Sequence, residues 1–495
     1  MERYDLAIVG SGAGLMVLEA ALSRGLRCAI VEKSKFGGTC LTKGCIPSKM
    51  LAYPADLIRE AGHARRIGLD FSPPEVDWAK ISARMWEQIG HSKSIENTLL
   101  GTENLTVYKG TGEFTGPNSM KVSYTGGEPS SEFEAERFVV AVGARSFVPE
   151  IEGLEESGYV VSETFFGEKF PEKPWESLVI VGGGPIGAEF AHIFSALGTR
   201  VSIVQSRERI LMNEEEEISE FVRRQFEENG IEVHTNARAV SAAPSGSNKA
   251  LTIEDKATGR RSTIEAEEIF IAAGVRSAAD SLRTEKAGIE LDSKGYIRTN
   301  DFLETSVPHI WAIGDINGKY QFRHKANYEA EVLVNNMFGN GDRKRAYYNS
   351  VPWAVYTHPQ VAHVGLTERE IQDSGLKYYV GKNYYSEVVG GIKMGYKKGD
   401  FDDGFVKLIV GEDRKILGVH IVGPHAAILL QPFVYLMNTG HICGRATKSG
   451  AGLSELRIMC PQLGTIAPIN ESMVIHPALS ELTAWALEKI DWGSD

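Results

Sequence analysis

Residues 4–33 read "YDLAIVGSGAGLMVLEAALSRGLRCAIVEK", and residues 176–206 repeat the pattern as "ESLVIVGGGPIGAEFAHIFSALGTRVSIVQS". Each segment reads as an apolar strand, a glycine-rich turn, a helix with apolar residues three to four apart, and a second apolar strand. This is the βαβ unit of a dinucleotide-binding fold. Two such units are much less likely than one to occur in a chain by chance. The sequence therefore predicts two nucleotide-binding domains.

The composition is that of a soluble enzyme. The chain has 495 residues, of which 42% are hydrophobic and 24% charged, enough for about three to four domains. Its net charge of -12 argues against a nucleic-acid partner, which requires a basic face. The sequence contains no apolar run of membrane-spanning length, and its start passes into a strand without a secretory signal. We therefore predict a cytoplasmic enzyme with no membrane partner.

Changes of pattern along the chain suggest where domains meet. The turn-rich "PEIEGLEESG" follows "FVVAVGARS" and suggests a boundary near Val148, and "EIFIAAGVRS" suggests a second crossing near residue 275. After Tyr347, alternating segments such as "FVKLIVG" and "ILGVHIVG" indicate an antiparallel sheet covered by helices. Residues 52–100 are expected to be mainly helical. The run Glu214–Glu217 is expected to begin a solvent-exposed helix, where acidic residues suit the dipole.

The first glycine turn departs from the usual spacing. Gly10 and Gly12 allow a tight turn and close approach of a pyrophosphate to the helix N-terminus. Glu32 ends the second strand, twenty residues after Gly12, where a carboxylate binds ribose hydroxyls. The third glycine of G-x-G-x-x-G would fall at Leu15, although Gly14 stands beside it. The alternative is an ordinary strand-to-helix turn.

The second glycine turn is complete but lacks the acidic residue. Gly182, Gly184 and Gly187 follow a strand in the expected spacing, and the second strand ends in Gln205, Ser206 and Arg207. A carboxylate there would repel a 2′-phosphate, whereas Ser206 and Arg207 are suited to bind one. This favours NADPH over NADH. The alternative is that Arg207 is a surface charge and that NADH still binds.

Cys40 and Cys45 stand five residues apart in "GGTCLTKGCIPSKM", residues 37–50. On a straight helix their Cα atoms would lie about 8–9 Å apart, too far for a disulfide. Gly44 directly precedes Cys45 and can adopt dihedral angles that bring the pair together. So short a loop constrains the unfolded chain little, so a bridge here suits redox exchange better than stability.

A zinc site is the alternative use of such a pair. It would need two more ligands, and the other cysteines, Cys28, Cys443 and Cys460, form no companion C-x-x-C pair. We therefore predict no metal site, and we expect all three to be small buried side chains, Cys28 in a strand. Lys49 lies one helical turn after Cys45, where its charge would favour a thiolate or reduced flavin. The alternative is an ordinary surface lysine.

Together these stretches resemble the FAD-dependent pyridine nucleotide–disulfide oxidoreductases, most of all dihydrolipoamide dehydrogenase. "GGTCLTKGCIPSK" resembles the redox-active motif, "TSVPHIWAIGD" the second FAD motif, and "VYTHPQVAHVGLTERE" the start of the dimerisation domain. "FRHKANYEAE" also matches, as does "AAGVRS", with Gly274 and Arg276 at its marked positions. The resemblance covers nearly the whole chain. It implies an α/β fold with two Rossmann-like domains, for FAD and NAD(P), and a C-terminal α+β dimerisation domain.

The same resemblance assigns domains and cofactor contacts. Residues 1–148 and 276–346 would form the FAD-binding domain, 149–275 the NAD(P)-binding domain, and 347–495 the dimerisation domain. The implied contacts of FAD are Gly10, Gly12, Gly14, Glu32, Gly38, Thr39, Lys49, Gly143 and Asp315. Those of NAD or NADP are Gly182, Gly184, Gly187, Glu189, Gln205, Ser206, Arg207 and Gly274. Lys49 and Glu189 would form an ion pair near the flavin.

The resemblance also implies catalytic roles. Cys45 would be the thiolate against the flavin, and Cys40 the thiol that exchanges with a dithiol or disulfide substrate. "HPALSE" resembles the family's C-terminal His-Pro-x-x-x-Glu pattern. His476 would move the proton for the cysteines of the other subunit of a homodimer, a task that suits histidine because an imidazole ordinarily titrates near neutrality. Glu481 would orient that imidazole.

Three functional hypotheses follow. The first is a dihydrolipoamide dehydrogenase-type enzyme acting on a lipoyl-carried dithiol. The second is an NADPH-dependent reductase of a low-molecular-weight disulfide, similar to mycothione or glutathione reductase, which Gln205 favours. The third is a flavoprotein without turnover, and the complete set of Cys40, Cys45, His476 and Glu481 argues against it.

One segment bears on the choice of substrate. Residues 438–473 look longer than the family's usual connection and carry Cys443 and Cys460, so they are candidates for reshaping the substrate channel. The cysteine pair that mercuric reductases carry at their C-terminus is missing from the final residues, "ALEKIDWGSD".

Overall fold

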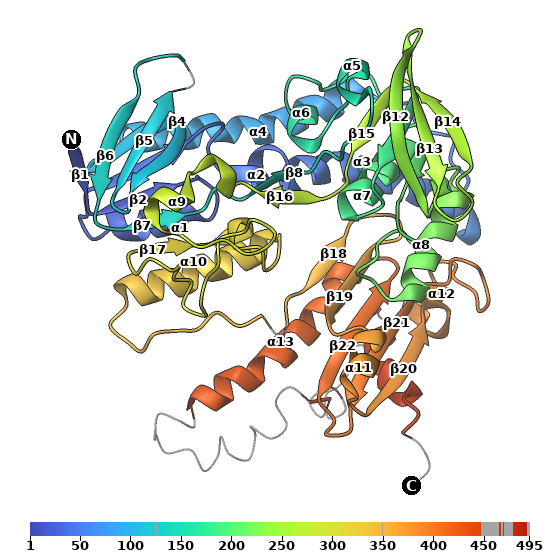
Figure 1. Cartoon of the computed structure of the whole chain (residues 1–495). Coiled ribbons are helices and arrows are strands. Elements are labelled where there is room, and N and C mark those ends of the chain that lie inside the picture. Colours follow the sequence, from blue (N-terminus) through green and yellow to red (C-terminus); the bar gives the residue numbers. More distant parts are fainter. Residues whose placement is uncertain (125, 349, 447–464, 467–468, 470–478, 493–495) are drawn as a thin grey trace.

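The computed structural model describes residues 1–124, 126–348, 350–446, 465–466, 469 and 479–492. Figure 1 shows three bodies: a large sheet around the N-terminus, a second sheet on the opposite side of the upper layer, and a third sheet below the second. Two of these sheets have a parallel core behind a glycine turn, and the third is antiparallel. The predicted fold class is therefore confirmed.

The first sheet has the strand order β1-β6-β5-β4-β3-β2-β7-β17. Its strands are β1 (Glu2–Tyr4), β2 (Leu6–Val9), β3 (Cys28–Glu32), β4 (Leu105–Gly116), β5 (Ser119–Tyr124), β6 (Ser131–Ala135), β7 (Phe138–Val140) and β17 (Ile310–Ala312). The strands from β4 to β17 in this order run parallel. β2 and β3 are buried along their whole length, as expected of parallel strands covered on both faces. Cys28 is fully buried in β3, as predicted.

The segments between and after these strands form helices and short helical turns (Figure 1). They are α1 (Gly14–Leu22), α2 (Gly38–Thr42), α3 (Cys45–His63), η1 (Ala64–Ile67), α4 (Trp78–Leu100), η2 (Ala279–Ser281), α9 (Thr284–Ala287), η3 (Gly314–Asn317) and α10 (Arg323–Phe338). The predicted helical region 52–100 is thus two helices, α3 and α4. The chain between them contains two consecutive prolines, which cannot continue a helix. α4 begins at an N-cap, where the Asp77 carboxylate accepts a 2.9 Å hydrogen bond from the Lys80 amide.

The second sheet is parallel, in the order β11-β10-β9-β15, and a three-stranded antiparallel sheet lies beside it. The strands are β9 (Ser177–Val181), β10 (Arg200–Val204), β11 (Glu232–His234), β15 (Glu268–Ile271), β12 (Ala237–Ser245), β13 (Asn248–Asp255) and β14 (Arg261–Ala266). The helices are α5 (Leu154–Ser157), α6 (Ser162–Phe165), α7 (Pro185–Ala196) and α8 (Glu216–Glu228). The chain enters and leaves this region through β8 (Ala144–Ser146) and β16 (Val275–Ser277), which pair antiparallel.

The third sheet is antiparallel, in the order β18-β19-β22-β21-β20. Its strands are β18 (Trp353–Val355), β19 (Val361–Gly365), β20 (Tyr378–Tyr384), β21 (Phe405–Gly411) and β22 (Ile416–Val422). Its helical elements are α11 (Glu368–Ser374), η4 (Tyr385–Glu387), α12 (Val389–Ile392), α13 (Ala426–Ala446), α16 (Ser480–Ala484) and η6 (Trp485–Lys489). Among the helices that the structure describes, none is both long and apolar enough to cross a membrane. The domain boundaries at 148, 275 and 346 stay predictions.

The prediction for Glu214–Glu217 was half wrong. α8 does begin here, with Glu216 and Glu217 in its first turn. Glu214 and Glu215, however, are buried, with only 3% and 7% of their surface exposed. Glu214 lies against the His363 side chain on β19, and Glu215 accepts a hydrogen bond from the Glu368 amide at the start of α11. Both contacts join segments about 150 residues apart and no local pattern predicts them.

A buried ion pair fixes the turn after β17. Lys325 and Glu329, one turn apart on α10, have side chains 1% and 0% exposed, with 3.1 Å between Nζ and Oε2. Glu329 Oε2 accepts the Gly314 amide at 2.7 Å, and Lys325 Nζ donates to the Gly314 carbonyl at 3.0 Å. Both backbone groups of Gly314 are therefore held by α10, and this turn carries Asp315.

Replacing Lys325 by Met should lower the free energy of unfolding by roughly 3–5 kcal/mol, because Glu329 would remain as an uncompensated buried charge. Urea unfolding of the protein, followed by tryptophan fluorescence, measures this. Lys93→Met is the matched control, because the exposed Lys93 pairs with Glu96 at the surface and its loss should cost less than about 1 kcal/mol. Equal stability of the two variants would contradict the assignment.

Candidate functional site

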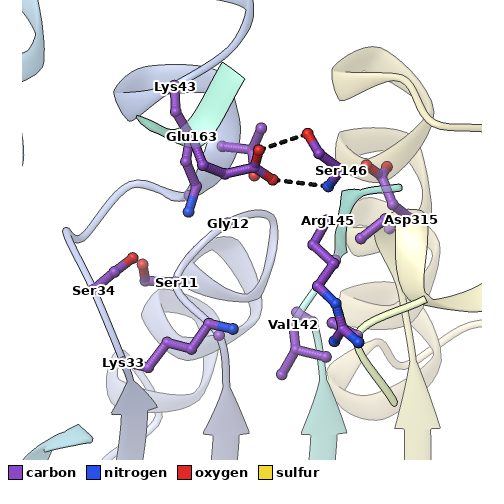
Figure 2. Close-up of a pocket in the computed structure, with 18 of the residues that line it drawn as sticks. Ser11, Gly12, Lys33, Ser34, Lys43, Val142, Arg145, Ser146, Glu163 and Asp315 are labelled. Atoms are coloured by element: carbon purple, nitrogen blue, oxygen red, sulfur yellow. Dashed lines mark hydrogen bonds between the residues drawn. The ribbon is translucent and has the colours of Figure 1, made fainter. Parts of the chain in front are cut away.

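A cavity of about 580 Å³ lies between the β2–α1 turn, the start of α2, β8 and η3. That is an ordinary size for a small-molecule site. The cysteine pair, Gly143 and Asp315 are among its lining residues. Figure 2 looks into it and shows polar side chains entering from several elements, with Lys33 and Ser34 on one side and Asp315 on the other. The cavity therefore brings together the N-terminal half of the predicted cofactor site and the turn after β17.

The first glycine turn is built for close backbone approach. Gly10 has φ +99°, and a Cβ on it would lie 2.4 Å from the Ala141 carbonyl oxygen. A Cβ on Gly14 would lie 2.7 Å from the Ile8 side chain, so Gly14 supplies the helix–strand contact that Leu15 cannot. Gly12 has nothing within 4 Å of its Cβ position among the described residues. The irregular spacing thus still leaves open space over the helix N-terminus, where a pyrophosphate fits.

Glu32 is held at the end of β3 by two serines. Its Oε2 accepts hydrogen bonds from the Ser11 amide at 2.9 Å and the Ser11 hydroxyl at 2.7 Å. Its Oε1 accepts the Ser34 amide at 2.9 Å. The Ser11 oxygen also accepts the Gly37 amide at 3.1 Å, which ties the cysteine segment to the glycine turn. Sequence reasoning missed Ser11, although it stands between the two glycines of the motif.

Asp315 has a carboxylate without a hydrogen-bond partner among the described residues. It lies half-buried at the start of η3 and lines the cavity. Burial raises its pKa to about 6, helped by the charge of Glu329 and opposed by that of Lys325. Because the Asp315 carboxylate faces the cavity, it could accept a hydrogen bond from a hydroxyl of a bound ribityl chain.

The two cysteines lie on either side of a helix break. α2 ends at Thr42 and α3 begins at Cys45, and Gly44 between them has φ −144° and ψ −113°, which is not helical. Gly44 thus adopts the non-helical backbone that the sequence suggested, and Cys40 and Cys45 lie close enough for each to shift the pKa of the other. Accepting the Cys40 hydrogen lowers the pKa of Cys45 to about 7, against the effect of burial and with help from Lys49. Donation and burial raise the pKa of Cys40.

The ion pair implied for Lys49 is present. Its Nζ lies 2.9 Å and 2.7 Å from the two carboxylate oxygens of Glu189 on α7. Glu189 Oε1 also accepts the Tyr356 amide at 3.0 Å, and the Lys49 ammonium lies 4.6 Å from the Tyr356 ring centroid. Lys49 is thus no ordinary surface lysine. The catalytic roles of the pair stay predictions.

A further carboxylate of the cavity, that of Glu163, was not predicted from the sequence. Glu163 accepts hydrogen bonds from the Ser146 amide at 2.9 Å and the Ser146 hydroxyl at 2.6 Å (Figure 2). Burial raises its pKa, but the bonds from Ser146 outweigh this and keep the pKa below the usual value. Lys43 adds a positive charge near it. Arg145, in the same view, pairs with Asp280 at 2.6 Å. Nothing local in the sequence marks these contacts.

The second glycine turn makes the same kind of close backbone contact as the first, at shorter distances. Gly182 has φ +119°, and a Cβ on it would lie 2.2 Å from the Ala272 carbonyl oxygen. A Cβ on Gly187 would lie 2.0 Å from the carbonyl oxygen of Gly182. Gly184 faces open space in the described part of the chain. Gly274, at the far crossing, has φ +115°.

Arg207, in the turn after β10, and Lys256 form a rim of basic side chains beside Ser206, here called the basic rim. Gln205 donates from Nε2 to the Arg209 carbonyl at 3.1 Å, so its amide is turned towards the chain. Ser206 and Arg207 are exposed. Lys256 reaches this rim and donates to the Ser206 carbonyl at 3.0 Å. The sequence predicted only Ser206 and Arg207 as partners of a phosphate. The fold brings Lys256 beside them.

Some of the predicted site residues lie outside the part of the chain that the structure describes. His476 and Cys460 are outside the described residues, as are the side chains of Glu481 and Cys443. Gly38 and Thr39 line the cavity, and a Cβ on Gly38 would lie 2.6 Å from Gly12 Cα. The proposed proton-moving pair of His476 and Glu481 therefore stays a prediction.

The comparisons with known proteins establish the family. Residues 4–330 match the family described as pyridine nucleotide-disulphide oxidoreductase, and residues 351–448 match its dimerisation domain. The chain therefore belongs to the pyridine nucleotide-disulphide oxidoreductases.

Two curated relatives carry different names. The chain is 34% identical to a mycothione reductase of Mycobacterium tuberculosis over 447 residues, which cover 89% of this chain and 94% of the relative. It is 30% identical to a dihydrolipoyl dehydrogenase of Bacillus subtilis over 488 residues, which cover 97% and 96%. The HOCl-induced flavoprotein disulfide reductase RclA from Escherichia coli shares the fold, with a TM-score of 0.77, 23% identity and coverage of 98% and 99%.

The cavity fits FAD, which this family uses together with NAD(P)H. Open space over Gly12 suits the pyrophosphate, Glu32 would hold the ribose, and Asp315, which has no hydrogen-bond partner in the described part of the chain, lines the same cavity. Bound FAD would supply two-electron transfer between NAD(P)H and the cysteine pair. The protein is thus an FAD-dependent disulfide oxidoreductase, and the hypothesis of a flavoprotein without turnover is set aside.

In the reduced protein, the Cys45 thiol should ionise with a midpoint near pH 7 and Cys40 only at higher pH. The ¹³Cβ chemical shift of labelled cysteine, assigned with Cys45→Ser, reports ionisation without needing reagent access. Lys49→Met should raise the Cys45 midpoint by about one unit, since a nearby cation is lost while Glu189 remains. Lys33→Met, in the same cavity but away from the thiols, should leave it unchanged. A Cys45 midpoint near the ordinary thiol value would contradict this electrostatic account.

Proposed function

We propose that this enzyme is an NADPH-dependent reductase of a low-molecular-weight disulfide. The observation that carries the proposal is the basic rim after β10, where Gln205 replaces a carboxylate and Arg207 and Lys256 stand near Ser206. The overall reaction consumes one disulfide, NADPH and a proton, and gives two thiols and NADP⁺.

The 2′-phosphate is the group that separates the two coenzymes. A carboxylate at Gln205 would bind the 2′-hydroxyl of NADH and repel the phosphate of NADPH. The rim instead offers an exposed guanidinium, an exposed hydroxyl and an ammonium. Such groups bind phosphate by charge-assisted hydrogen bonds. This arrangement supports NADPH, the reductant expected of a disulfide reductase.

The cysteine pair supplies the exchange chemistry. His476 of the partner subunit would first take the proton of Cys40, whose pKa is raised. The resulting Cys40 thiolate would attack one sulfur of the substrate disulfide, release the first product as a thiolate and leave a mixed disulfide on Cys40. Cys45, the more acidic thiol, would then attack Cys40 and release the second thiol, which re-forms the Cys40–Cys45 bond. His476 of the partner subunit, oriented by Glu481, would protonate the leaving thiolates. The match to the dimerisation domain supports a homodimer, and the use of reduced thiols supports a cytoplasmic location.

Oxidation of dihydrolipoamide by NAD⁺ is the second candidate. It uses the same cysteine pair in the opposite direction, and the dihydrolipoyl dehydrogenase of Bacillus subtilis aligns over 97% of this chain. The mycothione reductase relative supports the first candidate with the higher identity, 34%.

The ratio of kcat/KM for NADPH to that for NADH tests the coenzyme assignment. The wild type should favour NADPH, and Arg207→Ala should lower kcat/KM for NADPH about tenfold, the effect of losing roughly 1.4 kcal/mol of phosphate contact. The value for NADH should not change. Arg223→Ala is the control, because Arg223 is a cation of α8 paired with Glu227. A wild-type preference for NADH would overturn the assignment.

A substrate panel separates the two candidates. NADPH oxidation is measured with mycothiol-type, glutathione and lipoamide disulfides, and dihydrolipoamide oxidation is measured with NAD⁺ and NADP⁺. We expect the highest kcat/KM with a small disulfide and NADPH, and no disulfide turnover in Cys45→Ser. Faster dihydrolipoamide oxidation with NAD⁺ would establish the second candidate. Undiminished turnover in Cys45→Ser would refute the dithiol mechanism for both.

A further inference from the structure

Two histidines and a glutamate meet where the second sheet's domain contacts the third sheet. His363 on β19 and His420 on β22 are direct cross-strand partners, with ring centroids 5.4 Å apart. Glu214 reaches them from the segment before α8. One nitrogen of each imidazole and one carboxylate oxygen all lie within 4.8 Å of one another. The three side chains come from parts of the sequence that only the fold brings together.

The cluster contains more acceptors than donors. His363 Nδ1 lies 2.9 Å from Glu214 Oε2, so one carboxylate oxygen has a partner. His420 Nε2 lies 3.0 Å from the Leu366 carbonyl oxygen and must carry the hydrogen, which leaves a lone pair on Nδ1. In the described part of the chain, His420 Nδ1 and Glu214 Oε1 are both buried without a hydrogen-bond partner. His420 is 0% and Glu214 3% exposed, so leaving these two acceptors unpaired is costly.

An acidic cavity gives cations a route to this cluster. Glu214 and His363 line a cavity of about 1430 Å³, and eight glutamates but only three lysine or arginine residues are among its described lining residues. One of these cations, Lys407, is already engaged by Glu215 at 2.8 Å and Glu368 at 2.5 Å. The mouth of the cavity therefore carries a net negative charge, which concentrates cations.

We propose that Glu214, His363 and His420 bind one divalent transition-metal ion, of the zinc type. Two imidazole nitrogens and a carboxylate are a ligand set that zinc accepts, with a fourth position open to water. Bonds of about 2.1 Å hold tetrahedral ligands roughly 3.4 Å apart, so small rotations of these side chains close the 4.8 Å spread. The ion would satisfy both orphan acceptors and tie the start of α8 to the third sheet.

Equilibrium dialysis of the holoenzyme against Zn²⁺, with the cysteine pair kept oxidised, tests the proposal. The wild type should bind one ion per chain through this site. Glu214→Gln and His420→Gln should weaken binding at least tenfold, and in the second variant the introduced side-chain amide can still donate to the Leu366 carbonyl. Glu208→Gln is the matched control, because Glu208 lines the same cavity outside the cluster, and its binding should equal that of the wild type. A Cys40→Ser/Cys45→Ser double variant should also bind as the wild type does.

Each contrary result overturns the proposal. Equal binding in Glu214→Gln and wild type would place the ion elsewhere, loss in Glu208→Gln would mean diffuse attraction to carboxylates, and loss in the cysteine variant would mean binding by thiols. Co²⁺ gives a readout on the wild type alone, because a four- or five-coordinate site produces intense visible absorption. Absence of both that band and Zn²⁺ uptake would show that no metal binds. Since NADPH turnover is not the readout, failure here is distinct from failure of the proposed function.

Discussion

The ion pair between Lys49 and Glu189 is the contact on which the arrangement of the active site depends. Lys49 comes from α3 of the first domain, and Glu189 comes from α7 of the second. The same carboxylate accepts the Tyr356 amide, just after β18 of the third sheet. Removing either member of an ion pair that is shielded from water leaves the charge of the other member without compensation. One pair of side chains therefore fixes three bodies around the cysteine pair.

Around that contact, the chemistry is set by small differences between similar groups. Cys40 and Cys45 have the same side chain, yet their contact raises the pKa of Cys40 and lowers the pKa of Cys45. Glu32 and Asp315 both face the cavity. Glu32 accepts hydrogen bonds from Ser11 and Ser34, whereas the Asp315 carboxylate has no hydrogen-bond partner among the described residues. The fold thus assigns different tasks to like groups by controlling their neighbours.

Features that depend on short stretches of chain were predictable, and features that depend on distant packing were not. The glycine turns, the hinge at Gly44 and the buried Cys28 each follow from neighbouring residues. Leu15 stands where the motif has its third glycine, but Gly14 makes the close contact with Ile8 in its place. Glu163 and Lys256 gave no local signal, because their partners lie 17 and 50 residues away. The acidic run before α8 was misjudged for the same reason, since charge alone does not show which carboxylates a distant sheet will cover.

The pairing of β8 with β16 has a consequence for how this chain could have arisen and could be rebuilt. Val275 stands opposite Ser146, and Ser277 opposite Ala144, so the excursion from 147 to 274 leaves and returns at one place. A segment whose two ends lie together can be inserted into a host without changing the path of the host chain. The segment 147–274 is such an insertion on a two-stranded ribbon. A replacement for it would have to keep the register of that ribbon and supply a carboxylate that pairs with Lys49, as Glu189 does.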